Sequence, residues 1–400
     1  MNVLIVTDTY PPLRTSGAQQ IYDLGQAFIQ EGHQVTIVTP EPNQTQSIDI
    51  QTQEGIQVVR VKCFQTKDVN YIQRTAAELI NPFVIWRHLK SSTQMTNQNI
   101  DGVIWYSPSI FWGPLVKRLK AHYQCKSYLI LRDIFPDWAL DLGIIKKGPV
   151  FWFLKAVEKF QYQKADRIGV QTPNSLTYFV NQHPNLKDKC EVLWIWIGEA
   201  KVKPCSIDLS QTTLSGRSIF VYAGNMGVAQ NMDCLIDLAS KLKDRQDIGF
   251  VFVGRGSEVA RLRRRVADED LVNTLFFDEI DADEIPTLYA QCKAGILTLD
   301  QKHTTHNIPG KLLTYLRSGL PVLAIVNPGN DLMRMLHEMR IGVAIDKSNI
   351  EDTLHAFIQI MALVESKGDL KVDCQDVARN IFSSKQAAVT ISKFYLKKSS

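Results

Sequence analysis

Three short glycine-containing turns hold residue types suited to binding a phosphate group. They are Ser16-Gly17, Gly224-Asn225-Met226-Gly227 and Ile308-Pro309-Gly310-Lys311, and each leads into a helical pattern. A helix N-terminus presents free N–H groups and the positive end of the helix dipole, and both favour an anion. We therefore expect an anionic ligand to contact residues of these turns, namely Gly17, Gly224, Asn225, Gly227 and Gly310.

Lys311 would stand in the first turn of its helix, where a cation opposes the helix dipole unless an anion lies nearby. Its position therefore favours a phosphate ligand, and the alternative is a lysine that simply faces solvent. Arg132 and Arg255 are two further candidates to supply positive charge to such a ligand.

Short apolar runs alternate with amphipathic helical patterns along the whole chain. Runs of this kind occur at 2–7, 34–39, 56–61, 101–106, 127–131, 166–172 and 191–196, and again at 217–224, 247–254, 273–278, 293–299, 320–326 and 341–345. Strands that are apolar on both faces and alternate with helices predict parallel sheets covered by helices. The polar, unpatterned segment 203–216 separates the two series.

We therefore predict an α/β fold of two doubly wound, Rossmann-like domains that face each other across a cleft. The first would span 1–200 and the second 205–370, with helices at 375–400 packing back on the first domain. In such folds ligands bind at the carboxyl ends of the strands, so the interdomain cleft is the expected site.

Two common nucleotide-binding motifs are missing. The first strand is followed by no G-x-G-x-x-G fingerprint, and no G-x-x-x-x-G-K-[ST] motif occurs. Gly254-Arg255-Gly256 follows a strand but lacks the third glycine of the dinucleotide fingerprint. These absences argue against an NAD-dependent enzyme and against a P-loop nucleotidase.

Composition and charge exclude several other classes of protein. The chain has 400 residues, is 45% hydrophobic and carries a net charge of +4, which is typical of a folded globular protein and too small to indicate nucleic acid. Its seven cysteines form no C-x-x-C pair, so we expect reduced thiols in a cytoplasmic protein. The uncharged, largely apolar stretch Gly102–Val116 is shorter than the ~20 residues of a membrane-spanning helix.

Three short motifs resemble metal-binding or nucleic-acid-binding sequences, but we expect none of them to bind such a ligand. Asp281-Ala282-Asp283 spells a metal-binding D-x-D but precedes a helix, so we expect it to cap that helix. The basic run 261–265 lies on one predicted helix and is expected to face solvent, which leaves no nucleic-acid partner. His303 and His306 have no third ligand nearby, so no metal cofactor is expected.

The order of several motifs resembles glycosyltransferase family 4. The motifs are Y-P-P-x-x-x-S-G-A with H-x-V-T-I-V-T-P, then F-V-Y-A-G-N-M-G, F-V-F-V-G-R-G and I-P-G-K-L-L-T-Y-L-R-S-G-L-P-V. Within that family, R-D-I-F-P-D-W and H-N-I-P-G-K resemble bacterial enzymes of the WbuB type, which are linked to N-acetyl-L-fucosamine transfer in O-antigen or capsule assembly.

The resemblance implies the GT-B architecture and a glycosyltransferase that retains anomeric configuration. It implies a nucleotide-sugar donor, with UDP-N-acetyl-L-fucosamine as the best match, on the C-terminal domain. It also implies a lipid-linked saccharide acceptor on the N-terminal domain.

The chain departs from the family at two positions where the family carries glutamates eight residues apart. Alignment places His306 and Thr314 there. We expect His306 to hydrogen-bond the donor or its departing phosphate, and Thr314 to contact the ribose. In the N-terminal motif Arg132 replaces a histidine, and Asp133 is the candidate to orient the acceptor or the sugar, with helix capping as its alternative.

The segment 143–167 places lysines beside aromatic residues, and residues 74–167 carry 14 Lys and Arg against 7 Asp and Glu. Aromatic residues beside lysines suit an anionic lipid surface. Because the acceptor implied by the family is lipid-linked, we expect this segment to bind the inner face of the cytoplasmic membrane. The alternative is a core of aromatic residues with solvated lysines.

Two other classes of function stay open at this point. A nucleotide-sugar epimerase shares the two-domain architecture and also breaks a sugar–phosphate bond. A non-catalytic nucleotide-sugar-binding protein is consistent with the loss of both glutamates.

Overall fold

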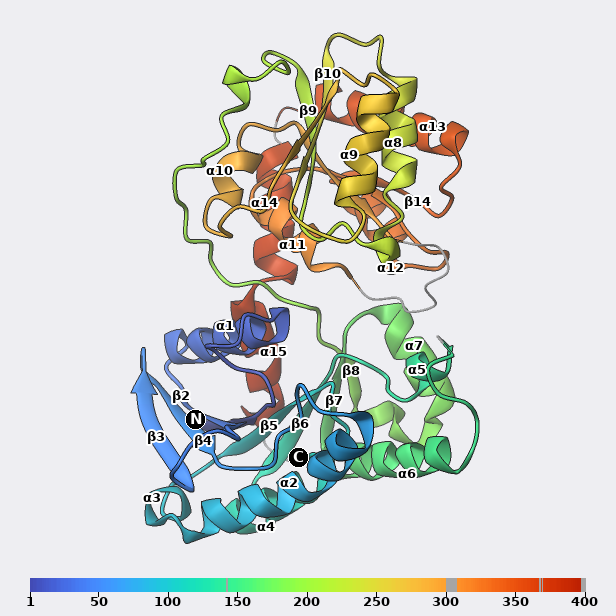
Figure 1. Cartoon of the computed structure of the whole chain (residues 1–400). Coiled ribbons are helices and arrows are strands. Elements are labelled where there is room, and N and C mark those ends of the chain that lie inside the picture. Colours follow the sequence, from blue (N-terminus) through green and yellow to red (C-terminus); the bar gives the residue numbers. More distant parts are fainter. Residues whose placement is uncertain (142, 300–307, 367, 369, 397–400) are drawn as a thin grey trace. The chain divides into compact units, whose positions relative to one another are not determined.

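The computed structural model describes residues 1–141, 143–299, 308–366, 368 and 370–396. The chain forms two compact units, of which the first comprises Met1–Gly198 with the chain from Ser384 onward, and the second comprises Glu199–Ser383 (Figure 1). Each unit is built on a doubly wound, largely parallel sheet, so the predicted fold class is confirmed.

The first unit contains an eight-stranded sheet in the order β3-β4-β2-β1-β5-β6-β7-β8. The strands are β1 Asn2–Val6, β2 Gln34–Pro40, β3 Ile48–Gln53, β4 Ile56–Val61, β5 Gly102–Ser107, β6 Lys126–Leu131, β7 Arg167–Val170 and β8 Cys190–Val192. The helices are α1 Ser16–Gln30, α2 Tyr71–Ser91, α3 Thr93–Thr96, α4 Gly113–Tyr123, α5 Asp137–Asp141, α6 Pro149–Lys164, α7 Pro173–Gln182 and α15 Ser384–Leu396, with a 3₁₀ helix at Pro184–Lys189.

Strand β3 pairs antiparallel with β4, and all other pairs in this sheet are parallel. The sequence pattern did not predict β3, because its residues are half-buried or exposed at the sheet edge and form no apolar run. Strand β8 is also shorter than the predicted 191–196, and the chain beyond Val192 leaves the sheet so that Trp196 packs beneath it.

Two helical layers cover the sheet of the first unit. Helices α2, α4 and α6 contribute residues such as Ile85, Leu115 and Tyr162 to the core on one face. On the other face, α1 and α15 lie side by side and share a core through residues such as Leu24 and Ile391 (Figure 1).

The chain returns to the first unit later than the sequence analysis placed it. Helix α14, Leu370–Ile381, lies in the second unit, and the first unit resumes at Ser384. The return is tightly fitted, because the Tyr395 ring packs on Gly102, where a Cβ would lie 2.5 Å from the ring. The Tyr395 hydroxyl donates to the Val103 carbonyl at 2.9 Å.

The second unit contains a six-stranded parallel sheet in the order β11-β10-β9-β12-β13-β14. The strands are β9 Ser218–Ala223, β10 Ile248–Val253, β11 Thr274–Phe277, β12 Ala294–Thr298, β13 Val322–Ile325 and β14 Gly342–Ile345. The remaining helices are α8 Asp233–Lys241, α9 Val259–Asp268, α10 Ile285–Tyr289, α11 Gly310–Arg317, α12 Asp331–Met339 and α13 Ile350–Ser366, with 3₁₀ helices at Leu209–Gln211 and Val228–Gln230.

This strand order reverses direction between β9 and β12, and in the first unit the same reversal occurs between β1 and β5. In doubly wound sheets the loops that leave the two strands on either side of such a reversal diverge, and the crevice between them is the usual ligand site. Each unit therefore has one topologically favoured place for a ligand.

Candidate functional site

In the second unit, the turns that follow β9 and β10 are joined backbone to backbone. The Gly224 N–H donates to the Val253 carbonyl at 2.8 Å, and the Met226 N–H donates to the Arg255 carbonyl at 2.7 Å. A Cβ on Gly254 would lie 2.1 Å from the Gly224 carbonyl oxygen. Only glycine fits this approach, so the two glycine turns form one rigid platform at the carboxyl edge of the sheet.

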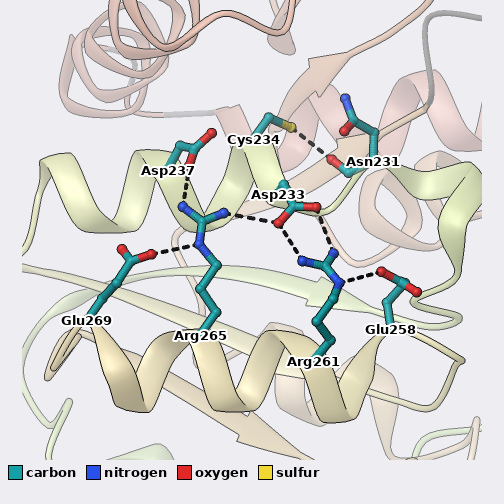
Figure 2. A network of polar contacts seen from close by, with 8 residues as sticks. All are labelled: Asn231, Asp233, Cys234, Asp237, Glu258, Arg261, Arg265 and Glu269. Carbon is teal, nitrogen blue, oxygen red and sulfur yellow. Dashed lines mark hydrogen bonds and ion pairs between the residues drawn. The ribbon is translucent and has the colours of Figure 1, made fainter.

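A network of ion pairs between α8 and α9 holds the helices that follow these turns (Figure 2). Asp233 accepts from Arg261 at 2.7 Å and from Arg265 at 3.0 Å, and Arg265 also binds Asp237 at 2.5 Å. Arg261 is exposed, as predicted for this face of α9, whereas Arg265 is half-buried, and both are ion-paired. Because α8 and α9 each continue from a glycine turn, the network fixes the two turns relative to each other.

Lys311 extends over the first of these turns. It lies in the first turn of α11, and a Cβ on Gly224 would meet the Lys311 Cε at 2.6 Å. Its Nζ lies 4.8 Å from the centre of the Tyr222 ring. Among the described residues no carboxylate forms an ion pair with it, and burial lowers the pKa of this lysine. An ammonium group held in this way is suited to an anion at the β9–β12 reversal.

Thr314 lies one turn further along α11. Its hydroxyl donates to the Lys311 carbonyl at 2.8 Å, and the Tyr289 side chain also hydrogen-bonds to it. The Thr314 proton is thus already used inside the helix, so any contact with a ribose would have to use a remaining lone pair. The next residue, Tyr315, is fully buried and donates to the Ile296 carbonyl at 3.0 Å, which anchors α11 on the sheet.

The other predicted residues of this unit have different surroundings. The amides of Asn225 and of Gly227 both donate to the Gln230 side-chain oxygen, at 3.1 and 2.9 Å. Gly310 is exposed, and a Cβ placed on it would have no atom within 4 Å. The Arg255 side chain is 79% exposed and lies 3.3 Å from Glu279, so it points away from the platform's interior. His306 lies outside the described residues.

In the first unit, Gly17 and Arg132 lie on two sides of Tyr106. A Cβ on Gly17 would be 3.3 Å from the Tyr106 hydroxyl. The Arg132 guanidinium lies beside Tyr106 and stacks on the Trp196 ring, 4.3 Å from its centre. The Trp196 N–H donates to the Gln20 carbonyl at 2.7 Å, which fixes the ring under the guanidinium.

Arg132 is only 6% exposed, and none of its three guanidinium nitrogens meets hydrogen-bond geometry with a described residue. Burial lowers the pKa of this group. Its polar neighbours are the Tyr106 side chain and the charge of Asp133, and an incoming anion would add a direct partner to this buried cation. Asp133 follows it just beyond the end of β6 and is half-buried. Burial raises the pKa of Tyr106, and the negative charge of Asp133 raises it further.

Two of the predictions above concern the D-x-D motif at 281–283 and the binding of metal. Asp281 and Asp283 do not cap α10 and instead bind Lys203 at 3.0 and 3.1 Å. Within the described ranges, no group of three metal-binding side chains comes together.

The basic segment 143–167 divides into two parts. Lys155 is not free for a membrane, because its Nζ lies 3.1 Å from Asp137 and 2.6 Å from the buried Glu158. Phe151 and Leu154 are buried. The remaining part, which we call the α6 surface, is exposed and consists of Ile144, Lys146, Lys147, Val150, Trp152, Phe153 and Lys159. No described helix is long and apolar enough to cross a membrane.

Sequence reasoning missed three polar groups at the β1–β5 reversal of the first unit. Asp8 Oδ1, the Tyr10 hydroxyl and Trp112 Nε1 are shielded from solvent and have no hydrogen-bond partner among the described residues. The available signal was the position of Asp8 and Tyr10 directly after the first strand. Its meaning depended on β5 lying next to β1.

The chain is similar in sequence and in structure to known glycosyltransferases. Residues 209–373 match the family Glycosyl transferases group 1. The glycosyltransferase named WbjE of Pseudomonas aeruginosa is 22% identical over 222 residues, which is 54% of this chain and 55% of that protein. The colanic acid biosynthesis glycosyl transferase named WcaI of Escherichia coli K12 is 20% identical over 391 residues, covering 91% and 93% of the two chains.

A solved structure of the E. coli trehalose-6-phosphate protein bound with UDP-2-fluoro glucose covers 100% of this chain and 99% of its own, with a TM-score of 0.69 and 10% identity. The fold is that of the GT-B glycosyltransferases. Residues 209–373, which match the group 1 glycosyltransferase family, contain the glycine platform and Lys311.

Proposed function

We propose that this protein transfers a sugar from a nucleoside diphosphate donor to a saccharide acceptor during the assembly of a surface polysaccharide. The names of WbjE and WcaI support glycosyl transfer, and that of WcaI supports polysaccharide assembly. The ligand of the UDP-2-fluoro glucose complex supports a UDP-sugar donor. The motif resemblance adds N-acetyl-L-fucosamine as the favoured sugar and retention of configuration as the stereochemical outcome.

One observation carries the donor site: the half-buried Lys311 ammonium over Gly224 has no counter-charge in the described part of its unit. A diphosphate at the β9–β12 reversal would supply that counter-charge and would also face the N-terminus of α11. During transfer the diphosphate leaves while the sugar carbon becomes cationic. A fixed cation and fixed N–H groups stabilise the charge that develops on the leaving group, and this arrangement requires no metal.

His306, Asp133 and Arg132 complete the proposed catalytic set. His306 would meet the donor from the segment before α11, as the motif alignment suggests. Arg132 and Asp133 would act from the carboxyl end of β6 in the first unit, Arg132 on an anionic group and Asp133 on a hydroxyl of the acceptor or the sugar.

The proposed acceptor is lipid-linked, and the α6 surface supports this part of the proposal. Trp152 is 63% and Val150 66% exposed, next to Lys146 and Lys147. Exposed aromatic residues beside lysines suit the headgroup layer of an anionic membrane. We therefore place the protein on the inner face of the cytoplasmic membrane.

A nucleotide-sugar panel tests the proposed function. Thermal shift with UDP-, GDP- and dTDP-sugars identifies the donor, since binding at 100 times Kd stabilises the folded state by about 2.7 kcal/mol. The matching donor should then be consumed only when a lipid-linked acceptor extract is added. Conversion of the donor without acceptor would instead identify an epimerase, and binding without any consumption would identify a non-catalytic protein.

A further inference from the structure

The first unit contains a pair of adjoining cavities at the carboxyl edge of its sheet, on either side of the chain that follows β1. The larger has a volume of about 210 Å³ and lies where the loops after β1, β2 and β4 meet. The smaller, of about 10 Å³, is near the size of a single water and reaches the start of α4. Asp8, Pro40 and Thr66 line both cavities, so Asp8 stands in the wall between them.

The polar groups around these cavities lack partners to an unusual degree. Tyr10 is 1% exposed and lines the larger cavity, yet its hydroxyl has no partner among the described residues. Trp112 is 4% exposed and lines the smaller one, and its Nε1 is likewise unpaired within the described ranges. Asp8 Oδ1, between them, is the third such atom. Each buried polar atom left unpaired destabilises the folded state, and a bound ligand that pairs with it removes that cost.

The charges of the larger cavity decide which ligand fits. Arg60, its most enclosed cation, is already engaged, because its Nη2 donates to the Pro11 carbonyl at 2.7 Å and its Nη1 lies 3.9 Å from Glu41. The lining also includes three carboxylates, those of Asp8, Glu41 and Asp68, against two cations, Arg60 and Lys67. An acidic ligand would therefore meet repulsion at Glu41 and Asp68 and, among the lining residues, no unoccupied buried cation.

The unpaired atoms instead match hydroxyl groups. A carboxylate oxygen accepts from a hydroxyl in a charge-assisted hydrogen bond, and a tyrosine hydroxyl can donate to one or accept from one. Both cavities lie at the carboxyl edge of the sheet, and the smaller one lies at the β1–β5 reversal, which is the usual position for a ligand in such a sheet.

We propose that these cavities form a sugar-binding subsite for an uncharged, hydroxyl-rich saccharide, with Asp8 and Tyr10 as its specificity-determining residues. The ring occupies the larger cavity, one hydroxyl donates to Asp8 and another bonds to Tyr10. Trp112 Nε1 is the hydrogen-bond donor on the other side of Asp8, at the smaller cavity. This inference rests on the proposed function in one respect, namely that the saccharide is the terminal part of the acceptor.

Saturation-transfer NMR on the full chain without nucleotide tests the subsite separately from transfer. The probes are neutral hexoses, N-acetylhexosamines and hexuronic acids. Neutral sugars should receive saturation from the wild type, and hexuronic acids should receive little. Asp8→Asn and the isosteric Tyr10→Phe should each weaken binding about tenfold or more, while Asp188→Asn, an exposed site elsewhere in the unit, should bind as the wild type does.

The same variants should raise the acceptor KM in the transfer assay and leave the thermal shift by the donor unchanged. The proposal is overturned if no neutral sugar binds the wild type, if hexuronic acids bind equally well, or if folded Tyr10→Phe and Asp8→Asn bind as the wild type does. A wild type that binds neutral sugars through Asp8 but transfers none would refute the proposed function and leave the subsite standing.

Discussion

The side chain of Lys311 occupies the space directly above Gly224, so that a Cβ on Gly224 would come within 2.6 Å of the Lys311 Cε. The two residues are far apart in the sequence. Gly224 follows strand β9 and Lys311 comes after strand β12, and these two strands are neighbours because the strand order reverses between them. The glycine and the lysine therefore act as one unit. The glycine opens the space, and the lysine places a desolvated ammonium in it.

Gly224→Ala should disrupt donor binding by displacing Lys311. The residue has φ +135°, a conformation that a side chain makes strained, and its neighbour's side chain fills the available space. We expect a loss of about 1–3 kcal/mol in the free energy of unfolding and a donor affinity reduced by at least about tenfold. Calorimetric titration with the donor nucleotide and urea unfolding measure the two effects.

Gly310→Ala provides the stability control for that substitution. Gly310 has no positive φ and no neighbouring atom in the way of a Cβ, so its free energy of unfolding should be unchanged or slightly raised. Equal destabilisation by both substitutions would contradict the role assigned to the space above Gly224.

Lys311 should make the stability of the ligand-free protein depend on pH. Burial lowers its pKa in the folded state below the ordinary value of 10.5, so near that lowered pKa the unfolded chain binds more protons than the folded one. Stability then rises with pH until the unfolded lysine has also lost its proton. Relative to Lys311→Met, the wild type should be less stable at pH 7 and should recover part of the difference by pH 9.5.

Chemical denaturation of both proteins across that pH range, without nucleotide, measures this difference. A difference that stays constant with pH would mean that Lys311 is solvated. In the transfer assay Lys311→Met should lower activity far more than it alters folding, since the variant lacks the cation proposed for the diphosphate.

Arg132→Met should separate stability from activity. The guanidinium is buried on the Trp196 ring without hydrogen-bond partners among the described residues, so an apolar side chain of similar length should preserve or increase the melting temperature. If Arg132 meets an anionic group in the reaction, kcat should fall by about 10²-fold or more. The two measurements are thermal unfolding and steady-state transfer. A variant with wild-type kcat would remove Arg132 from the proposed catalytic set.

The α6 surface should bind vesicles that contain anionic lipid, and binding should weaken with salt, since exposed charges are screened beyond about 10 Å at 0.1 M salt. Replacing Trp152 by Ala together with Lys146, Lys147 and Lys159 by Gln should abolish sedimentation with the vesicles. Lys155 is left intact in this variant because it is bound to Asp137 and Glu158. Unchanged sedimentation of the variant would assign these side chains to ordinary solvent exposure.

The positions of the apolar runs and of the glycines that follow them predicted most of the strands and turns. Continuous apolar runs such as 218–223 and 248–253 can be stable only as strands covered on both faces, and they became β9 and β10. The turns after them were also predictable, because a chain that reverses from strand to helix needs glycine or a capping residue there. The edge strand β3 was not, since half-exposed polar residues carry no such pattern.

The candidate site depended on contacts that cross the sequence. Periodicity could place Lys311 at a helix start, but only the strand order brought it over Gly224. The basic segment looked uniform in sequence, whereas packing paired Lys155 with buried carboxylates and left Lys146 exposed. Asp8 and Trp112 belong to no motif, and Tyr10 stands out only as the first residue of the Y-P-P motif. They became a candidate subsite because β1 pairs with β5, and an unpaired buried atom can be recognised only when everything that surrounds it is known.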